Sequence, residues 1–323
     1  MSKREKIGWV CSVIVLILLF LMSSTNLLIK ERVPEILPIS VIIRDDSDSF
    51  YQNFKKGMDQ AAKEYSADVN FITLYEDNDS LQQQMMIKRE IEDGAKAIVL
   101  APVNEQDIRK MVEGKQLNRP VVMIDSQPAG DLAVSDISMD YYEAGELVAE
   151  GLIRHLGRDI PVYLLTSGLD YGPNRQVYEG ATAVLERAGY DYSLVAGQSE
   201  DTCRELIESF VYPEMRPSAI IALDGDSLSK ASEILAGSTA YQRSVSGLYG
   251  IGATTAVLNR MDEEIVDGIV VCNQYDAGYL SIQRAVEMIN NPGSKSTETL
   301  KANYIEKKDL RAKRFEKMLY PIE

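Results

Sequence analysis

The sequence predicts an α/β protein with two doubly wound parallel-sheet lobes, preceded by an apolar helix at its N-terminus. Short apolar runs alternate with amphipathic helical patterns from Ile39 to Ile305, which is typical of parallel sheets covered by helices on both faces. The alternation restarts after residue 139 and so predicts a second sheet. The length of 323 residues also exceeds what one hydrophobic core usually organises.

The N-terminal segment has the layout of an export signal. Three basic residues precede the uncharged stretch Ile7–Ile29, and charge returns at Lys30. The stretch matches the roughly 20 residues that a membrane-spanning helix needs. No cysteine stands directly after the stretch, and Cys11 lies too early for lipid attachment. We therefore expect an uncleaved signal anchor rather than a cleaved signal, with a single pass through the cell membrane and everything after Lys30 outside the cytoplasm.

The first half of the remaining chain holds four expected strands, at 39–43, 69–74, 97–100 and 120–124. Expected helices lie between these strands, at 50–65, 80–94 and 105–115. The second half adds strands at 161–165, 192–196, 219–223, 247–251, 269–272 and 302–305. Its expected helices are 141–156, 177–188, 201–210, 227–236, 254–261 and 277–289. The two halves share this architecture, but no residue-level repeat between them is evident.

The composition argues against two classes of site. The chain has 49 acidic and 34 basic residues, for a net charge of −15. Such a surface repels nucleic acid, although it also serves plain solubility. The single histidine, His155, and three cysteines without CxxC or HExxH spacing give no support for a metal site. No cofactor is expected, and pairing of Cys203 with Cys272 stays open.

Polar residues follow many of the predicted strands, at the edge where ligands bind in parallel sheets. They are Arg44, Asp45, Asp46, Asp48, Asp125, Ser126, Gln127, Ser167, Gly168, Asp170, Asp224, Gly225, Asp226, Asn273, Gln274 and Asp276. Helix capping explains many of them singly. Their recurrence at several strand ends favours a ligand site at this edge.

Several segments resemble the ribose-type family of periplasmic sugar-binding proteins, which have the type I periplasmic binding fold. They are IIRDDSDSFYQNFKKGM, PVVMIDSQ, SMDYYEAG, SAIIALDGDSL and VCNQYDAGYLSIQRAVE, within a resemblance that spans residues 39 to about 306. The resemblance implies two lobes joined by a three-strand hinge, with crossings near 136–140, 272–275 and 300–303. Residues 1–37 are expected to hold a basic cytoplasmic tip, the signal anchor and a linker. The N-terminal lobe is expected at 38–139 plus 274–301, and the C-terminal lobe at 140–273 plus 302–323.

The resemblance also implies a set of ligand-binding residues. Ser126 is added because it follows a predicted strand, and Arg175 because it lies close to the position where the family often has arginine. The full set is Asp48, Phe50, Tyr51, Asp125, Ser126, Arg175, Asp224 and Asn273. Aromatic rings pack against the apolar faces of a sugar, and carboxylates and amides bind its hydroxyls. In the alternative interpretation, one or both of Phe50 and Tyr51 pack in the hydrophobic core and do not contact the sugar. For Tyr171, positions in the cleft, in the core and on the surface all stay open.

Three departures from the family pattern bear on the ligand. Val177 stands three residues before Gly180, where the family often has arginine, Gly252 replaces an aspartate, and Cys272 replaces the hinge glutamine. These differences put ribose itself in doubt. The sequence therefore predicts a sugar or polyol ligand without identifying it.

The function expected from these features is that of an extracytoplasmic binding module for a small sugar, serving an ABC importer. The alternative is a membrane-anchored sugar sensor that presents its ligand state to a histidine kinase. An enzyme is the remote third option, since GxSxG, P-loop and GxGxxG motifs are all missing from the sequence.

Overall fold

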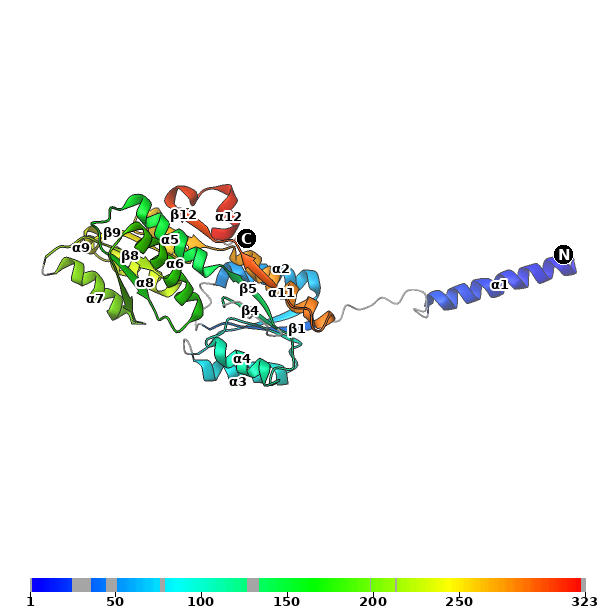
Figure 1. The fold of residues 1–323 in the computed structure, drawn as a ribbon. Helices are drawn as coiled ribbons and strands as arrows, with labels where there is room; N and C mark the ends of the chain where they lie inside the picture. Colours follow the sequence, from blue (N-terminus) through cyan, green and yellow to red (C-terminus); the bar gives the residue numbers. More distant parts are fainter. Residues whose placement is uncertain are drawn as a thin grey trace. The chain divides into compact units, whose positions relative to one another are not determined.

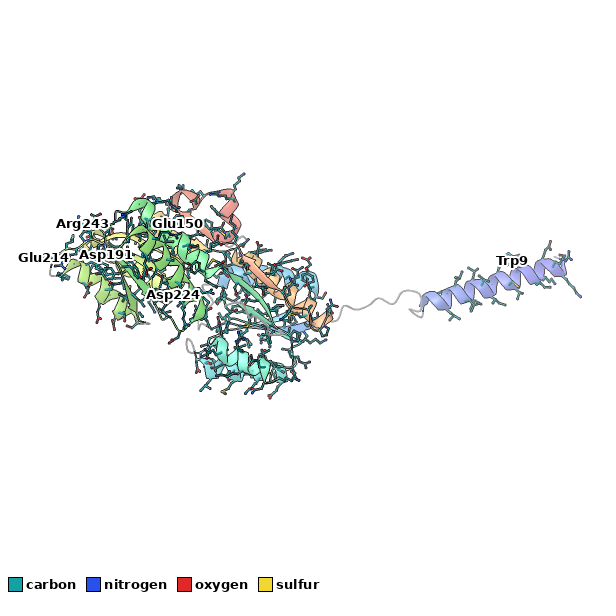
Figure 2. All side chains as sticks on the ribbon, in the orientation of Figure 1. Trp9, Glu150, Asp191, Glu214, Asp224 and Arg243 are labelled. Atoms are coloured by element: carbon teal, nitrogen blue, oxygen red, sulfur yellow. The ribbon has the colours of Figure 1, made fainter. Side chains whose placement is uncertain are left out.

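The computed structural model describes residues 2–24, 36–44, 51–75, 79–126, 134–197, 199–212 and 214–320. The chain divides into two compact units, Met1–Ile36 and Leu37–Glu323. The first unit contains helix α1 (Lys3–Ser24), whose apolar side chains are exposed. Trp9, for example, is 68% exposed (Figure 2). Over the part of the chain that is described, no helix combines the length and apolar character of a membrane span.

The second unit contains two six-stranded sheets (Figure 1). The first has the order β11-β5-β4-β3-β1-β2, and its pairings are parallel. Its strands are β1 (Leu37–Ile42), β2 (Ala67–Ile72), β3 (Ala97–Leu100), β4 (Val121–Ile124), β5 (Ser135–Met139) and β11 (Thr297–Leu300). Helices α2 (Gln52–Tyr65), α3 (Ser80–Glu92), α4 (Glu105–Glu113) and α11 (Gln274–Asn290) accompany this sheet. We call the sheet and these helices lobe 1.

The second sheet has the order β12-β10-β9-β8-β6-β7 and is parallel except for β12, which runs antiparallel to β10. Its strands are β6 (Val162–Thr166), β7 (Tyr192–Ala196), β8 (Ser218–Ala222), β9 (Val245–Ile251), β10 (Gly268–Val271) and β12 (Asn303–Glu306). The accompanying helices are α5 (Tyr141–His155), α6 (Gly172–Ala188), α7 (Glu200–Val211), α8 (Gly225–Ala236), α9 (Thr239–Ser244), α10 (Thr255–Asp262) and α12 (Lys313–Leu319), with the 3-10 turn Lys307–Asp309. This part is lobe 2.

Each sheet is covered on both faces because successive strand residues point to opposite sides. In lobe 1, Val41 and Val99 pack with α2 and α11, whereas Ile42 and Ile98 pack with α3 and α4. These two pairs of helices lie on opposite faces of the sheet (Figure 1). In lobe 2, α5 and α6 share one core, and α7, α8, α10 and α12 share the other. The prediction of two covered α/β sheets is confirmed.

The chain passes between the sheets at three places: after Met139, after Val271, and between Leu300 and Asn303. The strand order places the carboxyl ends of β1, β3 and β4 and of β6, β8 and β9 at the edges where a ligand site is expected. Strands β5 and β11, the short helix α9 and helix α12 were not among the predicted elements. The exact bounds of the two lobes stay a prediction.

A short motif is repeated at equivalent points of the two lobes. The sequences DYYEAG at Asp140–Gly145 and NQYDAG at Asn273–Gly278 each follow a strand and begin a helix. The first side chain caps the helix in both, since Oδ1 of Asp140 and of Asn273 accepts a backbone N–H three residues on. The two halves therefore do share a residue-level pattern, which the sequence analysis did not detect.

The glycine of each motif allows two helices to cross closely. A Cβ on Gly278 of α11 would lie 2.0 Å from the carbonyl oxygen of Phe54 in α2, and a Cβ on Gly145 of α5 would lie 2.2 Å from that of Val177 in α6. Only a residue without a side chain fits at such a distance. These crossings position the first turns of α5 and α11 beside the hinge.

Candidate ligand-binding site

A cavity of about 80 Å³ lies between the lobes at the carboxyl ends of their strands. That volume holds several water molecules. Its polar lining comes from both lobes and consists of Arg44, Tyr51, Asn53, Asp125, Tyr141, Tyr171, Asn174, Asp224 and Gln274. Its apolar lining consists of Met139, Pro173, Val177, Leu223, Ile251, Ala253, Val270, Val271, Cys272 and Met318, with Gly225 and Gly252 beside them.

Asp125, directly after β4, is the polar centre of the lobe 1 side. Its carboxylate accepts hydrogen bonds from the hydroxyls of Tyr51 at 3.2 Å and Tyr141 at 3.0 Å. Its φ of +47° is a left-handed conformation that side-chain-bearing residues rarely adopt. Burial raises the pKa of Asp125, although the Arg44 guanidinium and the two hydroxyls oppose that rise. A strained, buried carboxylate held by two phenols is a typical feature of a binding site.

The two tyrosines reach Asp125 from different elements. Tyr51 precedes α2, and its ring packs edge-on against Phe54 with centroids 5.8 Å apart. Tyr141 is the first residue of α5 and follows the helix cap Asp140. Burial and the nearby Asp125 carboxylate raise the pKa of Tyr141 well above its usual value, so its hydroxyl stays a donor. The Tyr51 ring thus serves the core, while its hydroxyl serves the site.

Tyr171 joins the two lobes across the cavity. It precedes α6 in lobe 2, and its hydroxyl donates to the backbone carbonyl of Asp125 in lobe 1. The Arg44 guanidinium lies over the Tyr171 ring, 4.1 Å from its centroid, in a favourable cation–π position. Of the positions left open for Tyr171, the structure places it in the cleft.

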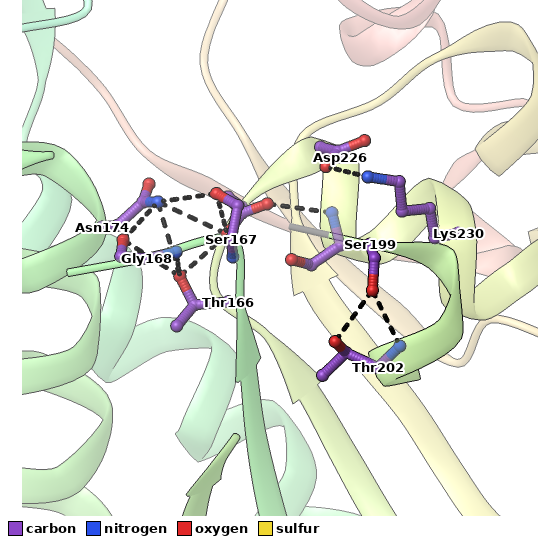
Figure 3. Close-up of polar contacts among 10 residues, drawn as sticks. Thr166, Ser167, Gly168, Asn174, Ser199, Thr202, Asp226 and Lys230 are labelled. Atoms are coloured by element: carbon purple, nitrogen blue, oxygen red, sulfur yellow. Dashed lines mark hydrogen bonds and ion pairs between the residues drawn. The ribbon is translucent and has the colours of Figure 1, made fainter. Parts of the chain in front are cut away.

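Asp224 organises the lobe 2 side. It caps α8 through Oδ1, which accepts the Ser227 N–H at 2.9 Å. Its Oδ2 accepts the Thr166 hydroxyl at 2.9 Å, and the backbone N–H of Ser167 at 2.9 Å. Asn174 completes this network, because its Nδ2 donates to the Gly168 carbonyl at 3.0 Å (Figure 3). Both carboxylate oxygens of Asp224 are therefore engaged within the protein, and Asp224 and Asn174 are the two network residues that line the cavity.

Three predicted site residues do not line the cavity. Ser126 is buried inside lobe 1, where its hydroxyl donates to Asp136. Arg175 is exposed, and its guanidinium holds the Leu169 carbonyl at 3.0 Å and 3.1 Å. Asn273 caps α11.

The other predicted residues divide between the cavity and the undescribed part of the chain. Tyr51, Asp125 and Asp224 line the cavity, while Asp48 and Phe50 lie outside the described residues.

Several cavity residues were missed as site candidates. Tyr141 lies within SMDYYEAG, one of the segments that resemble the family, but it was not chosen as a site residue. Asn174 directly precedes the predicted Arg175. Met318 carried no sequence signal, because it lies in a helix that was not predicted.

The cysteines form no disulfide, since all three are free. Cys203 belongs to α7 and is buried in the core of lobe 2, whereas Cys272 lines the cavity. Burial raises the pKa of the Cys272 thiol to about 12, which keeps it protonated at neutral pH. Among the described residues, no cluster of acidic, histidine or cysteine side chains is arranged to hold a metal ion.

A family model described as a periplasmic binding protein domain matches residues 39–294. The chain belongs to this family. The match covers both lobes up to the end of α11 and excludes β11, β12 and α12. No curated protein matches the chain.

Solved structures with the same fold agree with this membership. A glucose-galactose binding protein from Geobacillus stearothermophilus has a TM-score of 0.74 at 17% identity, covering 86% of this chain and 99% of its own. An ABC transporter solute-binding protein from Agrobacterium vitis, bound with α-D-tagatopyranose, has a TM-score of 0.77 at 15% identity, covering 88% and 99%. A Bacillus halodurans solute-binding protein with bound myo-inositol has a TM-score of 0.73 at 18% identity, covering 86% and 96%. The predicted type I periplasmic binding fold is confirmed.

Proposed function

We propose that the two lobes close around a small sugar or polyol, and that the chain is an extracytoplasmic binding protein for an ABC importer. The observation that carries the proposal is the interlobe cavity, with a buried carboxylate on one side and an amide on the other. Asp125, Arg44 and Asn174 supply acceptors and donors for hydroxyl groups. Tyr171 and the apolar lining suit the carbon-bound faces of a sugar ring.

The comparisons support a sugar-like ligand. The neighbours from Agrobacterium vitis and Bacillus halodurans hold a ketohexose and a cyclitol, both rigid rings with a rim of hydroxyls. Family membership also supports a binding role rather than catalysis.

The test is a thermal-shift screen of the full chain in detergent against monosaccharides, short oligosaccharides and polyols. A ligand at about 100 times its dissociation constant stabilises the folded protein by roughly 2.7 kcal/mol. We expect a hit that Asp125→Asn abolishes. Asp59→Asn, which changes an exposed carboxylate on α2, is the matched control and keeps the hit. No stabilisation by any member of the panel would contradict the sugar proposal.

We also propose that the N-terminal segment keeps the binding lobes at the outer face of the cell membrane. The uncharged stretch Ile7–Ile29 and the exposed apolar side chains of α1 support this role. We expect the chain to remain with membranes after alkaline carbonate washing, and a chain that begins at Leu37 to be released. Release of the full chain by the same washing would contradict an anchor.

The sensor role remains the second candidate, because no cysteine for lipid attachment follows the apolar stretch. A tethered binding protein stays near one membrane partner at high effective concentration. The neighbouring genes distinguish the roles, since permease and ATPase genes indicate an importer and a histidine kinase gene indicates a sensor.

A further inference from the structure

The C-terminal helix α12 reaches the candidate ligand cavity. Met318, near the end of this helix, is one of the cavity-lining residues and is 8% exposed. The helix lies beyond residue 294, where the match to the family model ends. The cavity is therefore completed by a part of the chain that the family model does not include.

The structure holds Met318 from three sides. Met318 is buried in the core of lobe 2 together with Phe315 and Leu319 of the same helix. The backbone carbonyl of Met318 accepts a hydrogen bond from Nδ2 of Asn53 in α2 of lobe 1, at 3.1 Å. Its sulfur lies 3.7 Å from Nδ2 of Asn303 in β12. Helix α12 is thus anchored in lobe 2, contacts lobe 1, and lies beside β12 (Figure 1).

Most of the other apolar lining lies in the sheets or just after a strand, and Pro173 and Val177 belong to the long helix α6. Ile251 and Val271 belong to β9 and β10, and Met139 ends β5, so these side chains have fixed positions in paired strands. Met318 differs because it comes from a short helix, and methionine is unbranched and adaptable in shape. A change at this position alters the cavity without altering a sheet.

We propose that α12 forms one wall of the cavity and that Met318 determines the size of the ligand accepted there. The proposal rests on the proposed function for the ligand, but the wall itself is testable without any sugar. Simple core packing is the competing explanation, and it predicts that Met318 and Leu319 behave alike.

The first experiment uses Cys272, which lines the same cavity, as a natural probe. In the full chain with Cys11→Ser, the rate of maleimide labelling at Cys272 is compared between variants by peptide mass spectrometry, because a thiol that burial keeps protonated reacts only as the cavity wall admits solvent and reagent. We expect Met318→Ala to raise the rate about tenfold, since it opens the wall, and Met318→Leu to restore the wild-type rate. Cys203, buried away from the cavity, reports any general unfolding. Equal rates in Met318→Ala and Leu319→Ala would overturn the proposal, whatever the ligand.

The second experiment measures the ratio of dissociation constants for a larger and a smaller member of the sugar panel. One methylene in an apolar pocket changes such a ratio about tenfold or more. We expect Met318→Ala to favour the larger sugar by at least that factor, and Leu319→Ala to leave the ratio unchanged. A ratio unchanged by Met318→Ala would overturn the role in specificity. Wild-type protein that binds no sugar contradicts the proposed function and leaves the labelling result as the test of the wall.

Discussion

The hydroxyl of Tyr171 in lobe 2 donates a hydrogen bond to the backbone carbonyl of Asp125 in lobe 1. The bond joins the two lobes through the residue that centres the candidate site. Because Arg44 of lobe 1 also lies over the Tyr171 ring, contacts within the protein itself hold the lobes in the arrangement that this structure shows. A ligand shifts the balance between open and closed forms only by its differential affinity for them, so these contacts set the starting point.

Tyr171→Phe removes the hydroxyl and keeps the ring beneath Arg44. We expect the closed form to lose about 1 kcal/mol, the usual net value of one hydrogen bond. Ligand affinity then falls about fivefold, as measured by isothermal titration calorimetry, and small-angle scattering of the ligand-free protein shows a larger radius of gyration. Tyr212→Phe is the control, because Tyr212 is 67% exposed in the same lobe. Unchanged affinity and radius would show that the bond does not bias closure.

Asp136 gives a prediction about pH. This carboxyl is buried in β5, and burial raises its pKa from 3.8 to about 7 despite hydrogen bonds from Ser126 and Ser138. Between those pH values the folded protein keeps a proton that the unfolded chain releases, so stability falls as pH rises through this window.

The substitution Asp136→Asn removes this titration and keeps an oxygen for the Ser126 hydroxyl. From pH 4 to pH 8, the free energy of unfolding of the variant relative to wild type rises by up to about 4 kcal/mol. Urea denaturation at both pH values measures it, with the exposed Asp59→Asn as the control. A difference that does not depend on pH would show that Asp136 is ionised in the folded protein throughout.

The architecture was largely predictable from sequence, whereas the site was predictable only in part. Strands such as Ala97–Leu100 are short and fully apolar, so their composition predicts burial on both faces of a sheet. β5 (Ser135–Met139) escaped prediction because serine and aspartate occupy buried positions that only hydrogen bonding satisfies. Helix α12 escaped because seven residues with several charges resemble a loop in composition.

The differences between the predicted site residues and the cavity lining share one physical cause. A polar side chain after a strand either accepts hydrogen bonds from the N–H groups at a helix N-terminus or contacts a ligand, and the sequence does not distinguish the two roles. Asp125 faces the cavity and Asn273 caps a helix, whereas Asp224 does both, since it lines the cavity, caps α8 and accepts the Thr166 hydroxyl. Helix phase explains why Arg175 does not line the cavity, since Asn174, one residue earlier, does.

Asn174 and Arg175 therefore make a matched pair. We expect Asn174→Ala to weaken ligand binding about tenfold, the effect of losing a buried polar contact of between 1 and 2 kcal/mol. Arg175→Ala frees the Leu169 carbonyl on an exposed loop and weakens binding less than threefold. Titration calorimetry with the sugar found in the screen measures both. A larger loss of ligand affinity in Arg175→Ala than in Asn174→Ala would show that Arg175, rather than Asn174, is the ligand contact on α6.

The close helix crossing in lobe 1 predicts a large penalty for one added methyl group. A Cβ on Gly57 of α2 would lie 1.9 Å from the carbonyl oxygen of Tyr275 in α11. Because backbone atoms cannot move aside easily, Gly57→Ala separates the helices and costs about 1–3 kcal/mol or more. Gly237→Ala is the control, since its Cβ would lie at ordinary contact distance, 3.4 Å from Ile234 O and 3.8 Å from Glu233 O, and its φ is −74°. Chemical denaturation compares the two variants, and equal stabilities would show that the α2–α11 crossing is not tight in solution.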